Sequence, residues 1–174
     1  MGKHHFSDLL RTALVLLYGG WIDSTMLLTS PIPDYIFDQV IFVFTRRPND
    51  CKYQVASSQF IFAKKGNKIL NRTMIGMLHY WKKHNKLISY YLYHYIFAVS
   101  AKLTDDTWAM FESTPWRLGT ENHLMQWRFA VKYNEAEWNQ MCKTTFVHKL
   151  TYKNTNPEIH KEGTYYTTIC RMYG

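Results

Sequence analysis

Cysteine is scarce in this 174-residue chain, which has only Cys51, Cys142 and Cys170. They are odd in number and widely spaced, which excludes a disulfide framework and is typical of a reducing compartment. Long hydrophobic runs are also missing. The run from Ala13 to Tyr18 is far too short to span a bilayer, and the N-terminal MGKHHFSD lacks the apolar stretch of a signal peptide. We therefore expect a cytoplasmic protein.

The sequence also lacks internal repeats, low-complexity tracts and linker-like stretches. Nothing in it marks a domain boundary, so we expect one domain over residues 1–174. What is present suits a packed core: 47% of the residues are hydrophobic and 17% aromatic, against 20% charged. This composition excludes intrinsic disorder.

Acidic residues are outnumbered, with 13 Asp and Glu against 21 Lys and Arg, a net charge of +8 and an isoelectric point near 9.3. Such a balance favours an anionic partner, which could be nucleic acid, acidic lipid or a phosphorylated small molecule. The basic residues occur as the pairs 46–47, 64–65 and 82–83 rather than as one long run. The solvated faces of an ordinary basic protein are therefore an open alternative.

Hydrophobic periodicity predicts a mixed order of helices and strands. We expect a helix from an N-cap at Ser7 to Gly19-Gly20, strands at 21–29, 39–45 and 59–63, and helices at about 68–84, 86–102, 121–132 and 135–143. The stretch TFVHKLTYK should end this pattern as a strand or extended loop, and 163–174 as a last strand or a frayed tail. The fold class expected is α/β.

The first helix carries the residues with most chemical content. Asp8 and Arg11 are three apart and so share a helix face, and Gly19-Gly20 permits close backbone approach. Asp23 follows where a strand is expected to end, and such an edge suits a divalent cation that bridges phosphates. Taken alone, a pair of glycines with a nearby aspartate is more often an ordinary turn than a metal site.

The stretch FSDLLRTALVLLYGGWIDST resembles the S-D-x-x-R, Y-G-G and D segment of nucleotide-sugar glycosyltransferases of the A-type fold, particularly bacterial capsular polysaccharide synthesis proteins. The later stretches LLTSPIPDYIFD, QFIFAKKGNKIL, YWKKHNKLISYYLYHYIF and YNEAEWNQMCKTTFVHKLTYK resemble family segments in the same order. The resemblance covers roughly residues 5–153. It implies the Rossmann-like nucleotide-diphospho-sugar transferase fold.

The resemblance also implies roles for the first helix and the glycines. Asp8 and Arg11 match the pair that holds the donor sugar hydroxyls and the nearby phosphate in proteins of this fold, and Gly19 and Gly20 match the donor-binding turn. Asp23 matches the first carboxylate of the metal-binding D-x-D motif. Asp8, Arg11 and Asp23 are therefore the catalytic residues that the resemblance predicts.

Three residues are implied as ligands of Mn²⁺ or Mg²⁺: Asp23, Thr25 and His148. Thr25 resembles the D-A-T form of the motif, in which a neutral hydroxyl replaces a second carboxylate and lowers the expected metal affinity. Lys149 resembles the lysine that approaches the donor diphosphate, where an ammonium stabilises the charge of the leaving group. Only Trp21 and Ile22 separate Gly20 from Asp23, one residue fewer than is common in the family.

The activity implied is transfer of a sugar from a nucleotide diphosphate donor to a capsular or other surface polysaccharide, metal-assisted and with retention of configuration. The acceptor would be a polysaccharide or glycolipid, and a peripheral contact with the membrane face is a further candidate partner. No nucleic acid is expected. Since few residues precede Ser7, we also expect the N-terminal nucleotide-binding part of the fold to be missing.

A second class of function stays open beside the transferase. Lysine and arginine pairs interleaved with aromatics, as in Tyr80-Trp81-Lys82-Lys83, suit a non-catalytic module that binds an anionic polymer, a lipid headgroup or nucleic acid. His94 lies in an aromatic stretch that predicts core or the wall of an acceptor groove. No Ser-His-Asp, Cys-His or zinc arrangement can be argued from the spacing.

Overall fold

The computed structural model describes residues 3–45, 55–115, 119–151 and 155–174, so Cys51 and the Arg46-Arg47 pair lie outside the described residues. The chain forms two compact units. Unit 1 comprises residues 1–22 and 34–118, and unit 2 comprises residues 23–33 and 119–174. Each unit has its own hydrophobic core.

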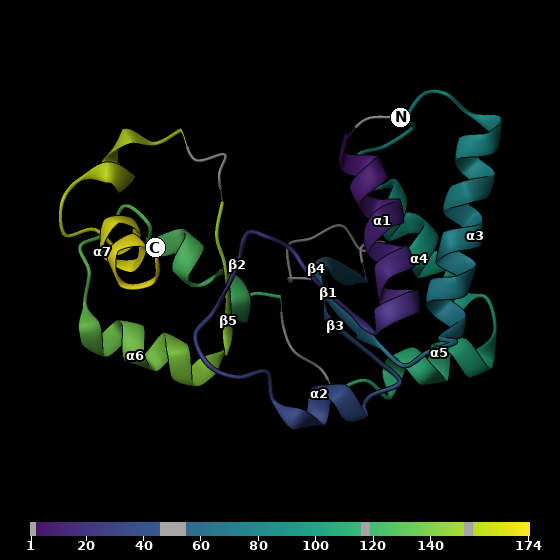
Figure 1. Cartoon of the computed structure of the whole chain (residues 1–174), viewed down its shortest axis with the longest axis horizontal. Coiled ribbons are helices and arrows are strands. Elements are labelled where there is room, and N and C mark those ends of the chain that lie inside the picture. The colour runs from purple at the N-terminus through teal and green to yellow at the C-terminus, as the bar shows by residue number, and fades with distance from the viewer. Residues whose placement is uncertain (1–2, 46–54, 116–118, 152–154) are drawn as a thin grey trace. The chain divides into compact units, whose positions relative to one another are not determined.

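Unit 1 contains a three-stranded antiparallel sheet in the order β1-β4-β3 (Figure 1). β1 is Gly20–Ile22, β3 is Ile41–Thr45 and β4 is Ala56–Ala63. Every residue of β3 is buried, as its continuous run of β-branched and aromatic side chains predicts. β3 and β4 confirm the strands expected at 39–45 and 59–63.

Helices pack beside this sheet and complete the core of unit 1 (Figure 1). They are α1 (Lys3–Tyr18), α2 (Asp34–Asp38), α3 (Lys68–Lys83), α4 (Leu92–Lys102) and α5 (Asp105–Glu112). α1 and α4 both contact β4, and α3 lies against α1 and α4. The core joins Val15 of α1 with Ile61 of β4 and Phe97 of α4. α3 confirms the helix expected at 68–84.

Two sequence expectations in unit 1 were wrong in their bounds. α1 begins at Lys3, so Ser7 is inside the helix, where its hydroxyl accepts a hydrogen bond from Arg11 instead of capping the first turn. α4 begins at Leu92, because the Ile88 and Tyr91 amides donate to side-chain oxygens rather than to helical carbonyls. α5 was not anticipated.

The strand expected at 21–29 is two strands. The Met26 amide donates to the Asp23 carbonyl oxygen at 3.0 Å, which closes a turn after β1. The chain then enters β2 (Met26–Leu28), which pairs in unit 2 with β5 (Val147–Lys149). Periodicity could not show this because both short strands have the same apolar character.

Unit 2 is mainly helical around the β2-β5 pair. Its other elements are η1 (Glu121–His123), η2 (Met125–Arg128), α6 (Glu135–Thr144), η3 (Pro157–His160) and α7 (Tyr165–Tyr173). The core gathers Met125, Phe129, Trp138, Tyr165 and Ile169. α6 confirms the helix expected at 135–143. β5 confirms a strand within TFVHKLTYK, whose last two residues, 152 and 153, lie outside the described residues.

Two expectations in unit 2 were wrong. Residues 121–132 form the short 3₁₀ helices η1 and η2 rather than an α-helix. Residues 165–173 form α7 rather than a strand or a frayed tail. Thr164 caps α7 by accepting a hydrogen bond from the Thr167 amide, and Tyr165 and Ile169 bury its inner face.

The two sheets bear on the fold class. The mixed α/β class is confirmed. All pairings between strands in the described residues are antiparallel, whereas a Rossmann-like sheet is mostly parallel. The A-type fold therefore stays a prediction from resemblance.

Candidate functional site

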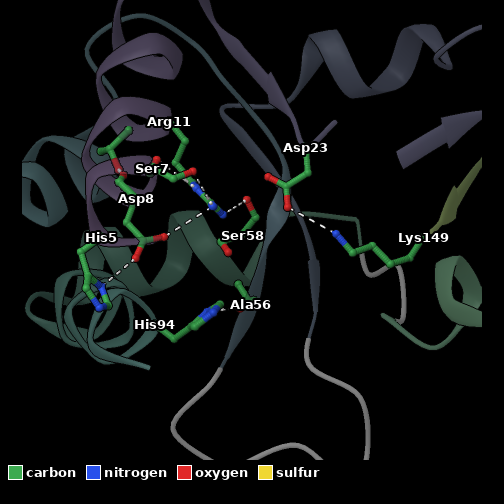
Figure 2. A network of polar contacts seen from close by, with 10 residues as sticks. His5, Ser7, Asp8, Arg11, Asp23, Ala56, Ser58, His94 and Lys149 are labelled. Carbon is green, nitrogen blue, oxygen red and sulfur yellow. Dashed lines mark hydrogen bonds and ion pairs between the residues drawn. The ribbon is translucent and has the colours of Figure 1, made fainter. Parts of the chain in front are cut away.

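Asp8 and Arg11 form an ion pair on α1, three residues apart as the sequence predicted. Arg11 Nη2 lies 3.5 Å from Asp8 Oδ1, and the side chains are only 9% and 13% exposed. Arg11 Nη1 also donates to the Ser58 carbonyl oxygen of β4 at 2.7 Å (Figure 2). Because the guanidinium is tied to the sheet as well as to its own helix, its position is fixed before any ligand arrives.

Aromatic rings enclose the Arg11 guanidinium. Its carbon Cζ lies 5.7 Å from the ring centre of Trp21 and 5.8 Å from that of Tyr93, within the range of cation–π attraction. Tyr93 is 3% exposed, and burial raises the pKa of its phenol to about 12 although the charge of Arg11 opposes this shift. The phenol is therefore a neutral hydroxyl at physiological pH.

Trp81 Nε1 is buried near this ion pair without a hydrogen-bond partner among the described residues. The buried Tyr93 hydroxyl has Thr12 as its side-chain partner. The His5 ring packs against the Trp81 indole at 5.4 Å between centres, and His5 Nδ1 faces Asp8 Oδ2 at 3.5 Å. An unmade hydrogen bond at a buried group costs about 1–3 kcal/mol. An open N–H of Trp81 near a charged pair favours a polar ligand.

The sequence interpretation missed His5, Trp81 and Tyr93. The spacing of His5 and Asp8, three apart on a helix, was the only signal available for His5. Trp81 and Tyr93 come from α3 and α4, so no local pattern relates them to α1. His94, expected in the core or a groove wall, is half-buried, and its Nδ1 lies 3.0 Å from the Ala56 carbonyl oxygen (Figure 2).

Gly19 and Gly20 have structural reasons to be glycine. Gly19 ends α1 with a φ of +89°, a conformation that side chains rarely adopt, and its amide donates to the Val15 carbonyl oxygen at 2.8 Å. A Cβ on Gly20 would lie 2.7 Å from the Phe62 ring. Gly19 also lines a pocket of about 210 Å³ beside Phe37. Contact of Gly19 and Gly20 with the donor stays a prediction from the resemblance.

Asp23, Thr25 and Lys149 come together in unit 2. The antiparallel register of β2 and β5 pairs Met26 with Lys149 and so brings Lys149 to the turn that precedes β2. Lys149 Nζ lies 3.4 Å from Asp23 Oδ2 (Figure 2). It also lies 2.5 Å from Thr25 Oγ1. The side chains of Lys149 and Asp23 are 17% and 23% exposed, so this ion pair is partly open to solvent.

His148 is enclosed in the core of unit 2. Neighbouring side chains of a strand point to opposite faces, so His148 and Lys149 diverge. The His148 ring is fully buried, 4.9 Å from Trp138 between ring centres, with Nε2 3.9 Å from Cys142 Sγ. Burial lowers the pKa of His148 to about 4, so the imidazole is neutral at pH 7.

These positions test the predicted metal site. The Lys149 ammonium lies between Asp23 and Thr25, and His148 faces away from both. Within the described residues, no group of three or more His, Cys, Asp or Glu side chains gathers where it could hold a metal ion. The arrangement of Asp23, Thr25 and His148 therefore does not fit a divalent cation shared by the three. The prediction of Mn²⁺ or Mg²⁺ rests on the resemblance alone.

The predicted site residues thus form two groups. Asp8, Arg11, Gly19 and Gly20 belong to unit 1, and Asp23, Thr25, His148 and Lys149 to unit 2. The structure joins Asp8 to Arg11, and Asp23 and Thr25 to Lys149. His148 also belongs to unit 2, but the alternation of side chains along β5 directs it away from Asp23, Thr25 and Lys149.

Comparison with known proteins completes these observations. No helix in the described part of the chain is long and apolar enough to cross a membrane. No curated protein and no solved structure matches the chain. One family model does match it, over residues 1–169, and its description is capsular polysaccharide synthesis protein. Because this match spans nearly all of the sequence, the chain belongs to the capsular polysaccharide synthesis protein family.

Proposed function

We propose that this protein is a glycosyltransferase that moves a sugar from a nucleotide diphosphate donor to a capsular or other surface polysaccharide. The family match over residues 1–169 supports a role in capsule synthesis. Transfer of a sugar is the reaction that extends a polysaccharide. The oxygen of an acceptor hydroxyl would bond to the anomeric carbon as the bond from that carbon to the diphosphate breaks, and the hydroxyl proton would pass to the leaving diphosphate.

The observation that carries the proposal is the enclosed Asp8–Arg11 pair. The Asp8 carboxylate is a strong acceptor for sugar hydroxyls, and the Arg11 guanidinium matches a phosphate group. In an enclosed, poorly solvated setting both interactions are stronger than in water. The buried N–H of Trp81, which has no partner among the described residues, would find one among the hydroxyl and phosphate oxygens of a bound donor, and the Tyr93 hydroxyl would bond a donor oxygen beside its contact with Thr12.

Lys149 is the residue proposed to assist departure of the diphosphate. Its ammonium is held by Asp23 and Thr25, which orient it, and its partial exposure leaves it accessible to a ligand. A fixed cation stabilises the negative charge that develops as the glycosidic bond of the donor breaks. We assign no covalent nucleophile, and retention of configuration stays a prediction from resemblance.

Isothermal titration calorimetry with a panel of nucleotide diphosphate sugars tests the proposal. One donor should bind to the wild-type chain, and Tyr93→Phe should weaken its affinity about tenfold, the value of one hydrogen bond. Tyr173→Phe is the matched control, because Tyr173 is 46% exposed in unit 2 and should leave affinity unchanged. Failure of every donor to bind would contradict the transferase.

The same titrations with and without Mn²⁺ test metal assistance, with Asp23→Ala as the variant. If the metal takes part, affinity rises with Mn²⁺ and Asp23→Ala removes that gain. The basic binding module predicts the reverse: steep salt dependence and indifference both to metal and to Asp23. Donor affinity that is unchanged by Asp23→Ala and by Mn²⁺ would remove Asp23 from the proposed donor site.

A further inference from the structure

One stretch of the sequence holds all the excess positive charge. From residue 51 to residue 104 there is no Asp or Glu, while nine Lys and Arg occur, against a net charge of +8 for the whole chain. The stretch includes β4, α3 and α4 of unit 1. An anionic surface would therefore be attracted to this part of the protein.

The connecting segment, defined as residues 82–91, joins the last turn of α3 to α4 at one end of this helix pair (Figure 1). It exposes large apolar side chains that follow one another closely: Ile88 is 79% exposed, Tyr90 61%, Tyr91 40% and Leu87 39%. Lys82, Lys83 and Lys86 are exposed beside them. A cluster of exposed large apolar side chains flanked by lysines is unusual on a surface that faces only water.

The connecting segment is held in place by Tyr80 of α3. The Tyr80 hydroxyl donates to the Lys86 carbonyl oxygen at 2.7 Å and accepts from the Ile88 amide at 3.0 Å. The Tyr91 amide donates to Ser89 Oγ at 3.2 Å and begins α4. These bonds order the backbone while Leu87 and Ile88 stay outside the core, so their exposure is built into the fold.

We propose that the connecting segment binds the surface of an anionic lipid bilayer. Leu87 and Ile88 enter the boundary between headgroups and acyl chains, and Tyr90 lies at headgroup depth, where tyrosine is favoured. Lys82, Lys83 and Lys86 contact the anionic headgroups. The contact is peripheral, and it does not depend on the transfer reaction proposed above.

The chemistry of the connecting segment favours lipid over two other occupants. Nucleic acid would be bound by stacking aromatics, and although Tyr90 and Tyr91 are exposed, the adjacent Leu87 and Ile88 have no π face to offer a base. A second copy of this chain, paired through the same segment, would bring its lysines against like charges, and the segment itself holds no acidic residue to compensate them. A bilayer accepts both the aliphatic side chains and the charges.

Vesicle flotation with the full chain tests the proposal, using phosphatidylcholine vesicles with and without 30% phosphatidylglycerol. The wild type should float with the anionic vesicles and not with the neutral ones, and binding should weaken as salt rises. Ile88→Ser should reduce partitioning about tenfold through lost apolar burial. Circular dichroism verifies that each variant is folded.

Two lysine pairs at opposite ends of α3 provide a matched comparison. Lys82→Glu with Lys83→Glu should reduce partitioning about 30-fold or more, since each lysine near an anionic surface contributes about fivefold. Lys64→Glu with Lys65→Glu makes the same change in net charge at exposed positions before α3. It should have a much smaller effect if the connecting segment is the contact.

The outcomes separate the alternatives. Equal losses from both lysine pairs would show a diffuse charge effect and overturn the proposal, as would wild-type flotation by the Ile88→Ser variant. Absence of flotation by the wild type would also overturn it. A gel-shift with single-stranded DNA or a concentration-dependent dimer, each abolished by the variants at 82 and 83 alone, would assign the connecting segment to another partner. Donor calorimetry is a separate readout, so the transferase can fail without affecting this result.

Discussion

The two units each contain a carboxylate paired with a cation, and they differ in how far the pair is removed from water. In unit 1 the Asp8–Arg11 side chains are 13% and 9% exposed, enclosed by rings and anchored to β4. In unit 2 the Asp23–Lys149 side chains are 23% and 17% exposed and meet at a turn. The first pair cannot be separated without leaving a buried charge, whereas the second can exchange its partner for water or a ligand.

This difference suggests how the two pairs contribute. An enclosed, anchored pair is preorganised and suits recognition of a fixed part of a donor, such as its sugar hydroxyls. The Asp23–Lys149 pair is partly exposed to solvent, so Lys149 can leave Asp23 and contact the negative charge that develops on the leaving diphosphate. The comparison is testable because stability and binding should respond differently in the two units.

The largest expected effect is on stability in unit 1. Arg11→Met should lower the free energy of unfolding by about 3–5 kcal/mol, because Asp8 is left charged and poorly solvated. Lys149→Met, the same change in unit 2, should cost about 1 kcal/mol, since water can solvate Asp23. Urea unfolding followed by circular dichroism measures both. Equal costs would contradict the comparison.

The next effect is acid sensitivity of unit 2. Burial lowers the pKa of His148 from 6.5 to about 4, so the folded state binds fewer protons than the unfolded state. The stability from this histidine is full above pH 6.5 and is lost as pH falls from 6.5 to 4, by about 3 kcal/mol in total. Urea unfolding at pH 7.5, 5.5 and 4.5 measures this loss.

His148→Leu should reduce that acid sensitivity, even if it changes stability at neutral pH. His79→Gln is the control, because His79 is exposed on α3 and should leave the pH profile as in the wild type. If His148→Leu loses as much stability toward pH 4.5 as the wild type, the imidazole is not held neutral by burial.

Two helix caps, one buried and one exposed, provide the same comparison with a smaller expected effect on stability. Asn67 is 3% exposed, accepts from the Leu70 amide at 3.0 Å and donates to the Val40 carbonyl oxygen at 3.1 Å. Asn67→Ala should therefore cost about 2 kcal/mol, while Asn134→Ala, at the exposed cap of α6, should cost about 1 kcal/mol. Urea unfolding ranks them, and the reverse order would be inconsistent with burial as the cause.

The smallest change in stability is expected at Tyr93. Its hydroxyl has Thr12 as a side-chain partner, and Thr12 keeps its own bond to the Asp8 carbonyl oxygen in the variant, so Tyr93→Phe should lower the free energy of unfolding by only about 0.5 kcal/mol at pH 7. The same variant is expected to weaken donor binding, so the two measurements diverge. A loss above 2 kcal/mol would show that the hydroxyl serves the fold instead.

Local sequence patterns predicted much of the secondary structure because the signals were local. The continuous apolar runs at β3 and β4 and the helical spacing of α3 needed no tertiary information. Where a distant residue decides a boundary, prediction failed. Tyr80 holds the backbone that precedes α4, and the chain between Trp21 and Leu28 divides between two sheets.

For the candidate site, the sequence by itself determined the Asp8–Arg11 pair, because three-residue spacing on a helix puts both side chains on one face. It also determined the basic balance of the chain and the resemblance that the family match supports. Only the tertiary structure decided that Trp21 and Tyr93 enclose Arg11, that Lys149 meets Asp23 and Thr25, and that His148 is buried. These contacts join elements that lie far apart in the chain. They depend on burial and on strand register, and a local sequence pattern contains information on neither.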